Sequence, residues 1–151
     1  MTHPGITIAP DAGDDVVAEI ERNLHEALRR NTPPTDYAPF TLVARDGAGR
    51  LIGGLVGGTA YGWLIVKILW VAEALRGQGI GARLMAEAEQ AAQARGCHGA
   101  WLDTSSRRAE AFYRRLGYAP FGALDNQPGD HAPAHRRAFM CKRFAASVLA
   151  P

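Results

Sequence analysis

The chain has 151 residues, which suits one domain that buries a core of its own. Hydrophobic residues make up 47% of the chain and charged residues 21%, as is typical of a globular protein that folds in water. The formal net charge is only +2, so charge gives no reason to expect nucleic acid as a partner. We therefore predict a single domain over residues 1–151.

The cysteine content and hydropathy of the chain indicate the cellular compartment in which we expect the protein. Cys97 and Cys141 are too few for a disulfide framework or a metal site, so we expect free thiols in a reducing environment. Residues 1–5 lack the start of a secretory signal. The longest apolar stretch, residues 63–72, contains Lys67 and is shorter than the roughly 20 residues that span a bilayer. We predict a cytoplasmic protein that binds no metal, nucleic acid or membrane.

The first half of the chain predicts one helix and several strands. Residues 6–8 are β-branched and predict a short first strand. An apolar residue then recurs at helical spacing after Asp14, and Pro33 ends the predicted helix. Residues 40–45 and 51–56 predict a hairpin, in which paired glycines weaken or bulge the second strand.

The second half predicts an alternation of strands and helices. The continuous apolar run over 63–71 predicts a strand that is buried on both faces. The remaining predicted elements are a helix over 80–95, a strand over 100–102, a helix over 107–116 and strands over 118–124 and 137–144, the last two joined by the loop 125–135. The order β-α-β-β-β-α-β-α-β-β predicts an α/β (α+β) fold with a mixed, mostly antiparallel sheet and helices on both faces. Residues 63–103 form its one parallel crossover.

The informative motif is Arg76-Gly77-Gln78-Gly79-Ile80-Gly81-Ala82, between an apolar strand and a helix. Helix N-termini carry unpaired N–H groups and partial positive charge, and glycines let an anion approach the backbone. The segment therefore predicts a phosphate or pyrophosphate site. The Gly-Lys-Ser/Thr of a Walker loop is absent, and the dinucleotide fingerprint lacks its third glycine. Asp103 follows the next strand, so a nucleotide-binding α/β protein stays an alternative, as does a plain glycine-rich turn.

Four segments together resemble the GNAT superfamily of N-acetyltransferases over about residues 40–144. Arg76-x-x-Gly79-x-Gly81 is similar to the family's coenzyme-A-binding motif, and Leu69-Trp70-Val71 to the strand before it. Ala109-x-x-Phe112-Tyr113-x-x-Leu116-Gly117-Tyr118 resembles its later helix, and Phe139-Met140-Cys141-Lys142 its last strand. The resemblance implies transfer of acetyl from acetyl-CoA to an amine, with the coenzyme bound where a parallel strand pair splays apart.

The resemblance also implies roles for single residues. Tyr113 is the general acid that protonates the departing thiolate. The residues expected to bind acetyl-CoA are Leu69, Trp70, Val71, Arg76, Gly77, Gln78, Gly79, Ile80, Gly81, Ala82, Ser106, Ala109 and Phe112. The backbone of Leu69 and Val71 pairs with the pantetheine arm, and an N–H there polarises the thioester. Ser106 stands where many members have asparagine.

The general base and the acceptor are open at this stage. Lys67 occupies the stretch where many members carry an acid, so Glu73, Asp103, His135 and solvent water remain candidates. Arg107, Arg108, Arg114 and Arg115 are expected at the surface, with one or two of them candidate contacts for the adenosine 3′-phosphate. We predict direct attack by a small-molecule primary amine, and a homodimer remains open because sheet edges often pair. The alternative is a coenzyme A sensor without catalysis.

Overall fold

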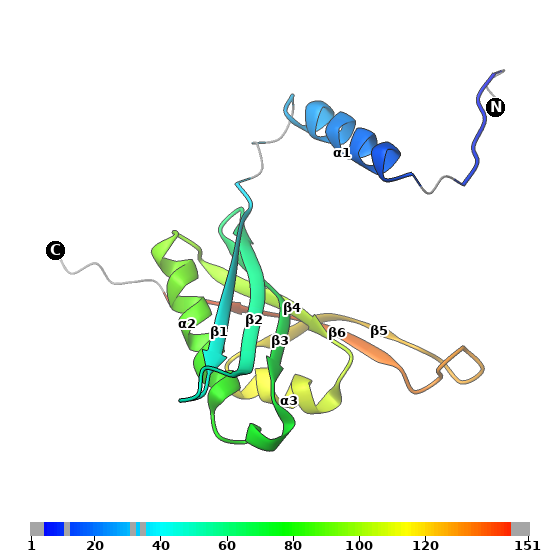
Figure 1. The fold of residues 1–151 in the computed structure, drawn as a ribbon. Coiled ribbons are helices and arrows are strands. Elements are labelled where there is room, and N and C mark those ends of the chain that lie inside the picture. Colours follow the sequence, from blue (N-terminus) through cyan, green and yellow to red (C-terminus); the bar gives the residue numbers. More distant parts are fainter. Residues whose placement is uncertain (1–4, 11–12, 31–32, 34–35, 146–151) are drawn as a thin grey trace. The chain divides into compact units, whose positions relative to one another are not determined.

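A six-stranded sheet organises the chain from Asp36 onward (Figure 1). The computed structural model describes residues 5–10, 13–30, 33 and 36–145. It falls into two units, Met1–Thr35 and Asp36–Pro151, each described by itself. In the first unit, α1 (Asp14–Leu28) is an amphipathic helix that buries none of its own residues. No helix among the described residues is long and apolar enough to cross a bilayer.

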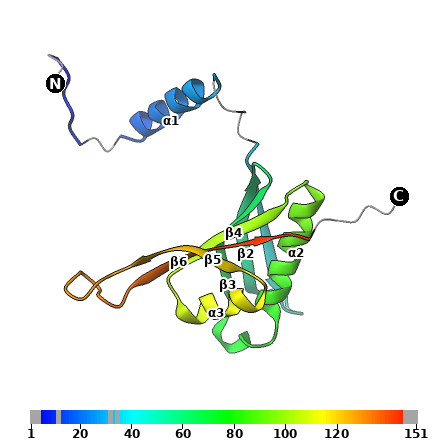
Figure 2. The ribbon, with the colours of Figure 1, turned by 180° about the vertical axis from the view of Figure 1, so that it is seen from behind.

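The sheet of the second unit has the order β1-β2-β3-β4-β6-β5. Its strands are β1 (Ala38–Arg45), β2 (Leu51–Ala60), β3 (Trp63–Val71), β4 (Gly99–Thr104), β5 (Ala119–Asp125) and β6 (Arg136–Arg143). All neighbouring strands pair antiparallel except β3 and β4, which are parallel. Figure 2 shows the β5–β6 hairpin projecting from the rest of the sheet.

Two helices and a short 3-10 turn complete this unit. The turn η1 (Glu73–Leu75) leads from β3 into α2 (Ile80–Ala94), which packs against β1, β2 and β3. The helix α3 (Arg107–Arg115) follows β4 directly. Both helices contribute to one core, whose largest fully buried side chains are Leu55, Leu64, Met85, Leu102 and Met140. The sheet therefore gains its stability from the face that these helices cover.

A bulge in β3 separates this strand from β4. The β2–β3 register jumps from Val56↔Ile68 to Gly57↔Val66, so Lys67 has no partner on β2. The parallel β3–β4 pairing runs only from Trp63↔Gly99 to Val66↔Leu102. Beyond that point β3 stays with β2, while β4 stays with β6. A bulge bends its strand and raises its local twist, which leaves a gap between the two parallel strands.

A polar cluster of Glu89, Tyr118 and Lys142 links α2 to β6 and to the residue before β5. The Lys142 ammonium lies 2.7 Å from one Glu89 carboxylate oxygen, and the Tyr118 hydroxyl donates to the other oxygen over 3.0 Å. Burial and the adjacent Glu89 carboxylate both raise the pKa of Tyr118. The half-buried pair therefore fixes α2 against β6 with its hydrogen bonds satisfied.

The predicted fold class is confirmed: the sheet is mixed and mostly antiparallel, with one parallel pair. The first strand over 6–8 is wrong, because these residues form no ladder and Ile8 is 96% exposed. A three-residue segment without a neighbouring strand has no partner for its backbone groups. Burial of 63–71 on both faces is also wrong, because Ile68 and Trp70 are exposed after the bulge.

The burial of each leucine predicts how much stability the fold loses when that side chain is shortened to alanine. Leu64→Ala in β3 removes a fully buried side chain, so we expect the free energy of unfolding to fall by about 3 kcal/mol. Leu124→Ala, the same change at a 60% exposed position of β5, should lower it by less than about 1 kcal/mol. Urea unfolding followed by circular dichroism measures both. Equal losses in the two variants would contradict this assignment of the core.

Candidate active site

The glycine-rich loop adopts a backbone that exposes the start of α2. Gly77 and Gly79 have φ angles of 79° and 80°, in the left-handed region that favours glycine. Gly79 is the N-cap of α2, and no side chain caps the helix. The first backbone bond of the helix joins the Arg83 N–H to the Gly79 carbonyl over 3.0 Å. The N–H groups before Arg83 are therefore left to bind an external acceptor.

A cavity of about 660 Å³ lies in front of this helix N-terminus. Its walls come from the end of β3, the loop, the start of α2 and one face of α3. They consist of Leu69, Trp70, Val71, Leu75, Arg76, Gly77, Gly79, Ile80, Gly81, Ala82, Ser106, Arg108, Ala109, Phe112, Tyr113, Arg115 and Leu116. The charged members of this set are three arginines, and none is acidic. With the helix dipole, they make the cavity a site for an anionic ligand.

The arginine at the mouth of this cavity is held by the strand. Arg76 donates from Nε to the Val71 carbonyl over 3.1 Å. This contact uses one of the five guanidinium N–H groups, so the fork retains donors for a phosphate oxygen. The bond holds the cation in the wall of the cavity that the N-terminus of α2 also lines.

Close packing holds α2 and α3 together along the cavity wall. Gly81 of α2 faces Phe112 of α3, where a Cβ atom would lie in van der Waals contact, 3.4 Å from Cζ of the ring. Ser106 is the N-cap of α3, and its hydroxyl accepts from the Ala109 N–H over 3.2 Å. The Ser106 hydroxyl hydrogen remains available to a ligand. The serine therefore both begins the helix and lines the cavity.

Tyr113 projects from α3 into an almost buried position. Its side chain is 8% exposed and packs edge-on against the rings of Phe112 and Tyr118. No hydrogen bond links its hydroxyl to another described residue, yet no fully buried polar side-chain atom in this part of the chain lacks a partner. The hydroxyl therefore reaches open space. Burial raises the pKa of Tyr113, so the phenol keeps its proton at neutral pH.

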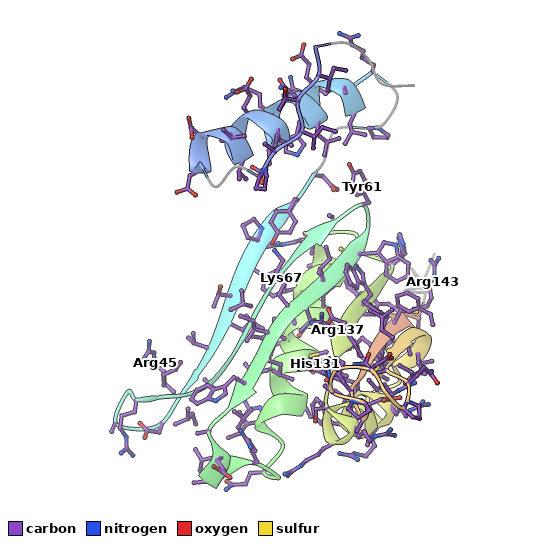
Figure 3. The ribbon with its side chains drawn as sticks, turned by 90° about the vertical axis from the view of Figure 1, so that its right-hand side faces the viewer. Arg45, Tyr61, Lys67, His131, Arg137 and Arg143 are labelled. Atoms are coloured by element: carbon purple, nitrogen blue, oxygen red, sulfur yellow. The ribbon has the colours of Figure 1, made fainter. Side chains whose placement is uncertain are left out.

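A second cavity, of about 360 Å³, occupies the gap between the splayed strands. It is lined by Val66, Lys67, Ile68, Leu69, Asp103, Thr104, Ser105, Ala109, Tyr113 and Arg137. Leu69, Ala109 and Tyr113 line both cavities, so the two adjoin at these side chains. Arg137 Nε lies 2.7 Å from Asp103 Oδ2, and Figure 3 labels Lys67 of β3 and Arg137 of β6. This second space is therefore polar and charged.

The structure brings almost all the predicted site residues together. Every residue expected to bind acetyl-CoA lines the first cavity except Gln78, and Tyr113 lies where it meets the second. Of the candidate bases, Asp103 lines the second cavity, whereas Glu73 and His135 line neither. The prediction missed Leu75 and Leu116, and it left open which arginines of α3 line the cavity, which are Arg108 and Arg115. Helical spacing contained a signal for these arginines, because Arg108 and Arg115 lie four residues before and three after Phe112.

The cysteines lie outside both cavities. Cys97 is buried, and burial raises the pKa of its thiol, which disfavours the thiolate. Cys141 is half-buried on β6. Among the described residues, no group of three His, Cys, Asp or Glu side chains is arranged to hold a metal ion. The ionisable side chains that line the two cavities are Tyr113, Lys67, Asp103 and four arginines.

Comparison with known proteins identifies the class of enzyme. The chain is 44% identical to an acetyltransferase of Agrobacterium fabrum over 90 residues, which cover 60% of this chain and 66% of that relative, just under two thirds of its length. It is 40% identical to the blasticidin-S acetyltransferase of Streptomyces morookaense over 106 residues, covering 68% and 77% of the two chains. A solved structure from Agrobacterium tumefaciens matches with a TM-score of 0.80 and 34% identity, over 93% of this chain and 99% of that one. The chain is thus similar to acetyltransferases over most of its length.

The family follows from the model that matches residues 12–118, which is that of the acetyltransferase (GNAT) family. The chain belongs to this family. The resemblance predicted from the loop, the tyrosine helix and the last strand is confirmed. The roles of the individual residues are not tested by the match and remain predictions.

The loop geometry predicts how coenzyme binding is lost. Gly79→Glu places a carboxylate at the start of α2, so we expect coenzyme A affinity to fall more than about tenfold, or 1.4 kcal/mol. Gly49→Glu in the β1–β2 turn is the control, because Gly49 has the same φ of 80° and an equally open surrounding. Both variants should lose about 1 kcal/mol of stability. Calorimetry that finds equal affinities in the two variants would exclude this anion site.

Proposed function

We propose that the chain transfers the acetyl group of acetyl-CoA directly to a primary amine of a small molecule, with Tyr113 as general acid. The observation that carries this proposal is the meeting of two cavities at Tyr113. One is cationic and lies at a helix N-terminus, and the other is polar and lies between splayed strands. A donor and an acceptor bound in these cavities would meet beside one buried phenol.

The first cavity suits the coenzyme part of the donor. The N–H groups at the start of α2, together with Arg76, are placed to hold the pyrophosphate. Arg108 and Arg115 line the same cavity and offer further charge for a phosphate group. Leu69 and Val71 follow the end of the β3–β4 pairing, so their backbone on that side is available to a pantetheine arm.

The second cavity suits the amine. Asp103 binds Arg137 through Oδ2, which leaves Oδ1 to accept from an amine N–H. The amine loses a proton to Asp103 or water, and its nitrogen bonds to the thioester carbon as the carbon–sulfur bond breaks. Tyr113 donates its hydroxyl proton toward the departing sulfur. Because neither cysteine lines a cavity, the chain offers no thiol for a covalent route.

A small acceptor is favoured by two observations. The second cavity has a volume of about 360 Å³, near the lower end of the range for small-molecule sites. The relative from Streptomyces morookaense, 40% identical, is a blasticidin-S acetyltransferase. We infer that this chain also modifies a compact amine rather than a folded protein surface.

If Tyr113 is the general acid, its removal should lower the turnover rate without weakening coenzyme A binding. Tyr113→Phe should lower kcat by about 100-fold or more, because a positioned acid contributes roughly that factor, while coenzyme A affinity changes little. Tyr118→Phe is the matched control, since Tyr118 contacts the Tyr113 ring but lines neither cavity. It should lower stability through loss of the Glu89 bond and spare kcat. Thiol release with a panel of amines measures this, and an unchanged kcat in Tyr113→Phe would reject the role.

The pKa of Tyr113 predicts the alkaline side of the pH profile. Burial raises this pKa above its ordinary value of 10.0, so the phenol stays protonated throughout the neutral and mildly alkaline range. We expect kcat to show no loss from ionisation of this group below pH 10. The profile of thiol release measured on wild type and Tyr113→Phe tests this. A fall with an apparent pKa below 10 that disappears in the variant would contradict it.

A further inference from the structure

We propose that the acceptor amine also carries a carboxylate, which binds between Lys67 and Arg137 in the second cavity. This inference rests on the proposed function and adds the chemical class of its acceptor. Neither cation is needed for the acetyl transfer itself, so their presence in the acceptor cavity calls for a ligand of opposite charge. The substrate class is therefore a compact aminocarboxylate rather than a simple amine or a polyamine.

Lys67 is placed in the cavity by the bulge of β3. It is the residue that the β2–β3 register skips, and a bulge re-aims the side chain of its extra residue. Its ammonium lies 4.9 Å from the centre of the Tyr37 ring. No carboxylate of the described residues lies within ion-pair distance of it. Lys67 is thus a cation without an anionic partner at the wall of the cavity.

Arg137 brings a second cation from a different strand. Its Nε lies 2.7 Å from Asp103 Oδ2, and this ion pair orients the guanidinium. Its terminal nitrogens make no ion pair or hydrogen bond with any other residue in the described part of the chain. Two parallel N–H donors of an arginine match a carboxylate in bidentate geometry. Asp103 therefore positions Arg137 for a ligand while retaining one oxygen for the amine.

The charge of the cavity selects a carboxylate. Its charged lining residues are Lys67, Arg137 and Asp103, so two positive charges and one negative charge leave an excess of +1. One carboxylate on an acceptor whose amine reacts as the neutral base balances this excess. A phosphate dianion would exceed it, and a polyamine would add positive charge to an already positive site.

The two cavities also fix the order of groups along the acceptor. Tyr113, Leu69 and Ala109 mark the junction, whereas Lys67 and Arg137 line the second cavity alone. The amine must therefore point to the junction, and the carboxylate must lie away from it. An acceptor that carries both groups on a short frame satisfies both positions at once.

The test measures binding without turnover. The coenzyme-A-bound protein is titrated by calorimetry with N-acetylglycine, 4-acetamidobutyrate and 6-acetamidohexanoate, each against its own carboxamide. We expect at least one carboxylate to bind about tenfold more tightly than its carboxamide, since a hydrogen-bonded charge contributes about that much. 2-Acetamidoethyl phosphate is titrated in the same way, to compare a phosphate with the carboxylates. Equal binding of all three pairs, absence of binding, or tighter binding of the phosphate would overturn the proposal.

Variants localise the effect. Lys67→Gln should lower carboxylate affinity about three- to fivefold and leave carboxamide affinity unchanged. Arg137→Lys keeps the charge but loses the fork, so it should also weaken the carboxylate. Arg45→Gln is the control, because Arg45 bonds to Gly49 in the β1–β2 turn and lines neither cavity (Figure 3). An equal loss in the Arg45 variant would assign the effect to overall charge and reject the site.

The two proposals fail in different ways. Thiol release from acetyl-CoA, measured with 4-aminobutyrate and with butylamine, reports on the transfer, whereas the titrations report on the carboxylate. Faster release with butylamine than with 4-aminobutyrate would support acetyl transfer and overturn the aminocarboxylate class. Loss of coenzyme A binding in the unmodified chain would overturn the proposed function before the acceptor is considered.

Discussion

The departure of β3 from β4 after Val66 and Leu102 is the constraint on which the site depends. Backbone groups in a sheet must remain paired, and here each strand keeps one partner, β2 for β3 and β6 for β4. The gap therefore opens without leaving either strand detached from the sheet. The unpaired position of Lys67 marks the place where β3 bends. Both cavities border this gap, so one local irregularity in register creates the space for two ligands.

The positive potential of the first cavity follows from the direction of α2 and from the arginines around it. The N-terminus of α2 faces the first cavity, where its dipole and three arginines act together on an anion. Gly81 of α2 packs against Phe112 of α3, and Tyr113 of α3 lines the same cavity as the loop. The fold thus brings the proposed coenzyme site and the proposed proton donor together where the two helices touch.

Much of this arrangement could be predicted from sequence because its signals are local. The loop, the start of α2 and the tyrosine face of α3 each depend on spacing within a few residues. The bulge at Lys67 depends on the register of β2, and the pairing of Asp103 with Arg137 joins residues far apart in the chain, so spacing contained no signal for either. The strand predicted over residues 6–8 is wrong because only local composition supported it. Its β-branched composition is favourable, but strand formation requires a neighbour that composition does not supply.

The burial of Tyr113 defines what the residue can do as an acid. A free thiol has a pKa of about 8.5 and a phenol about 10, and burial moves the phenol further up. Full proton transfer from Tyr113 to a free thiolate is therefore unfavourable by more than one pKa unit. In the proposed mechanism the phenol would instead stabilise the sulfur most while negative charge develops on it, by donating a hydrogen bond. The amine releases a proton in the same reaction, and that proton balances the final charge. A buried tyrosine that holds its own proton firmly is therefore suited to the transition state, where a more acidic group would be partly ionised.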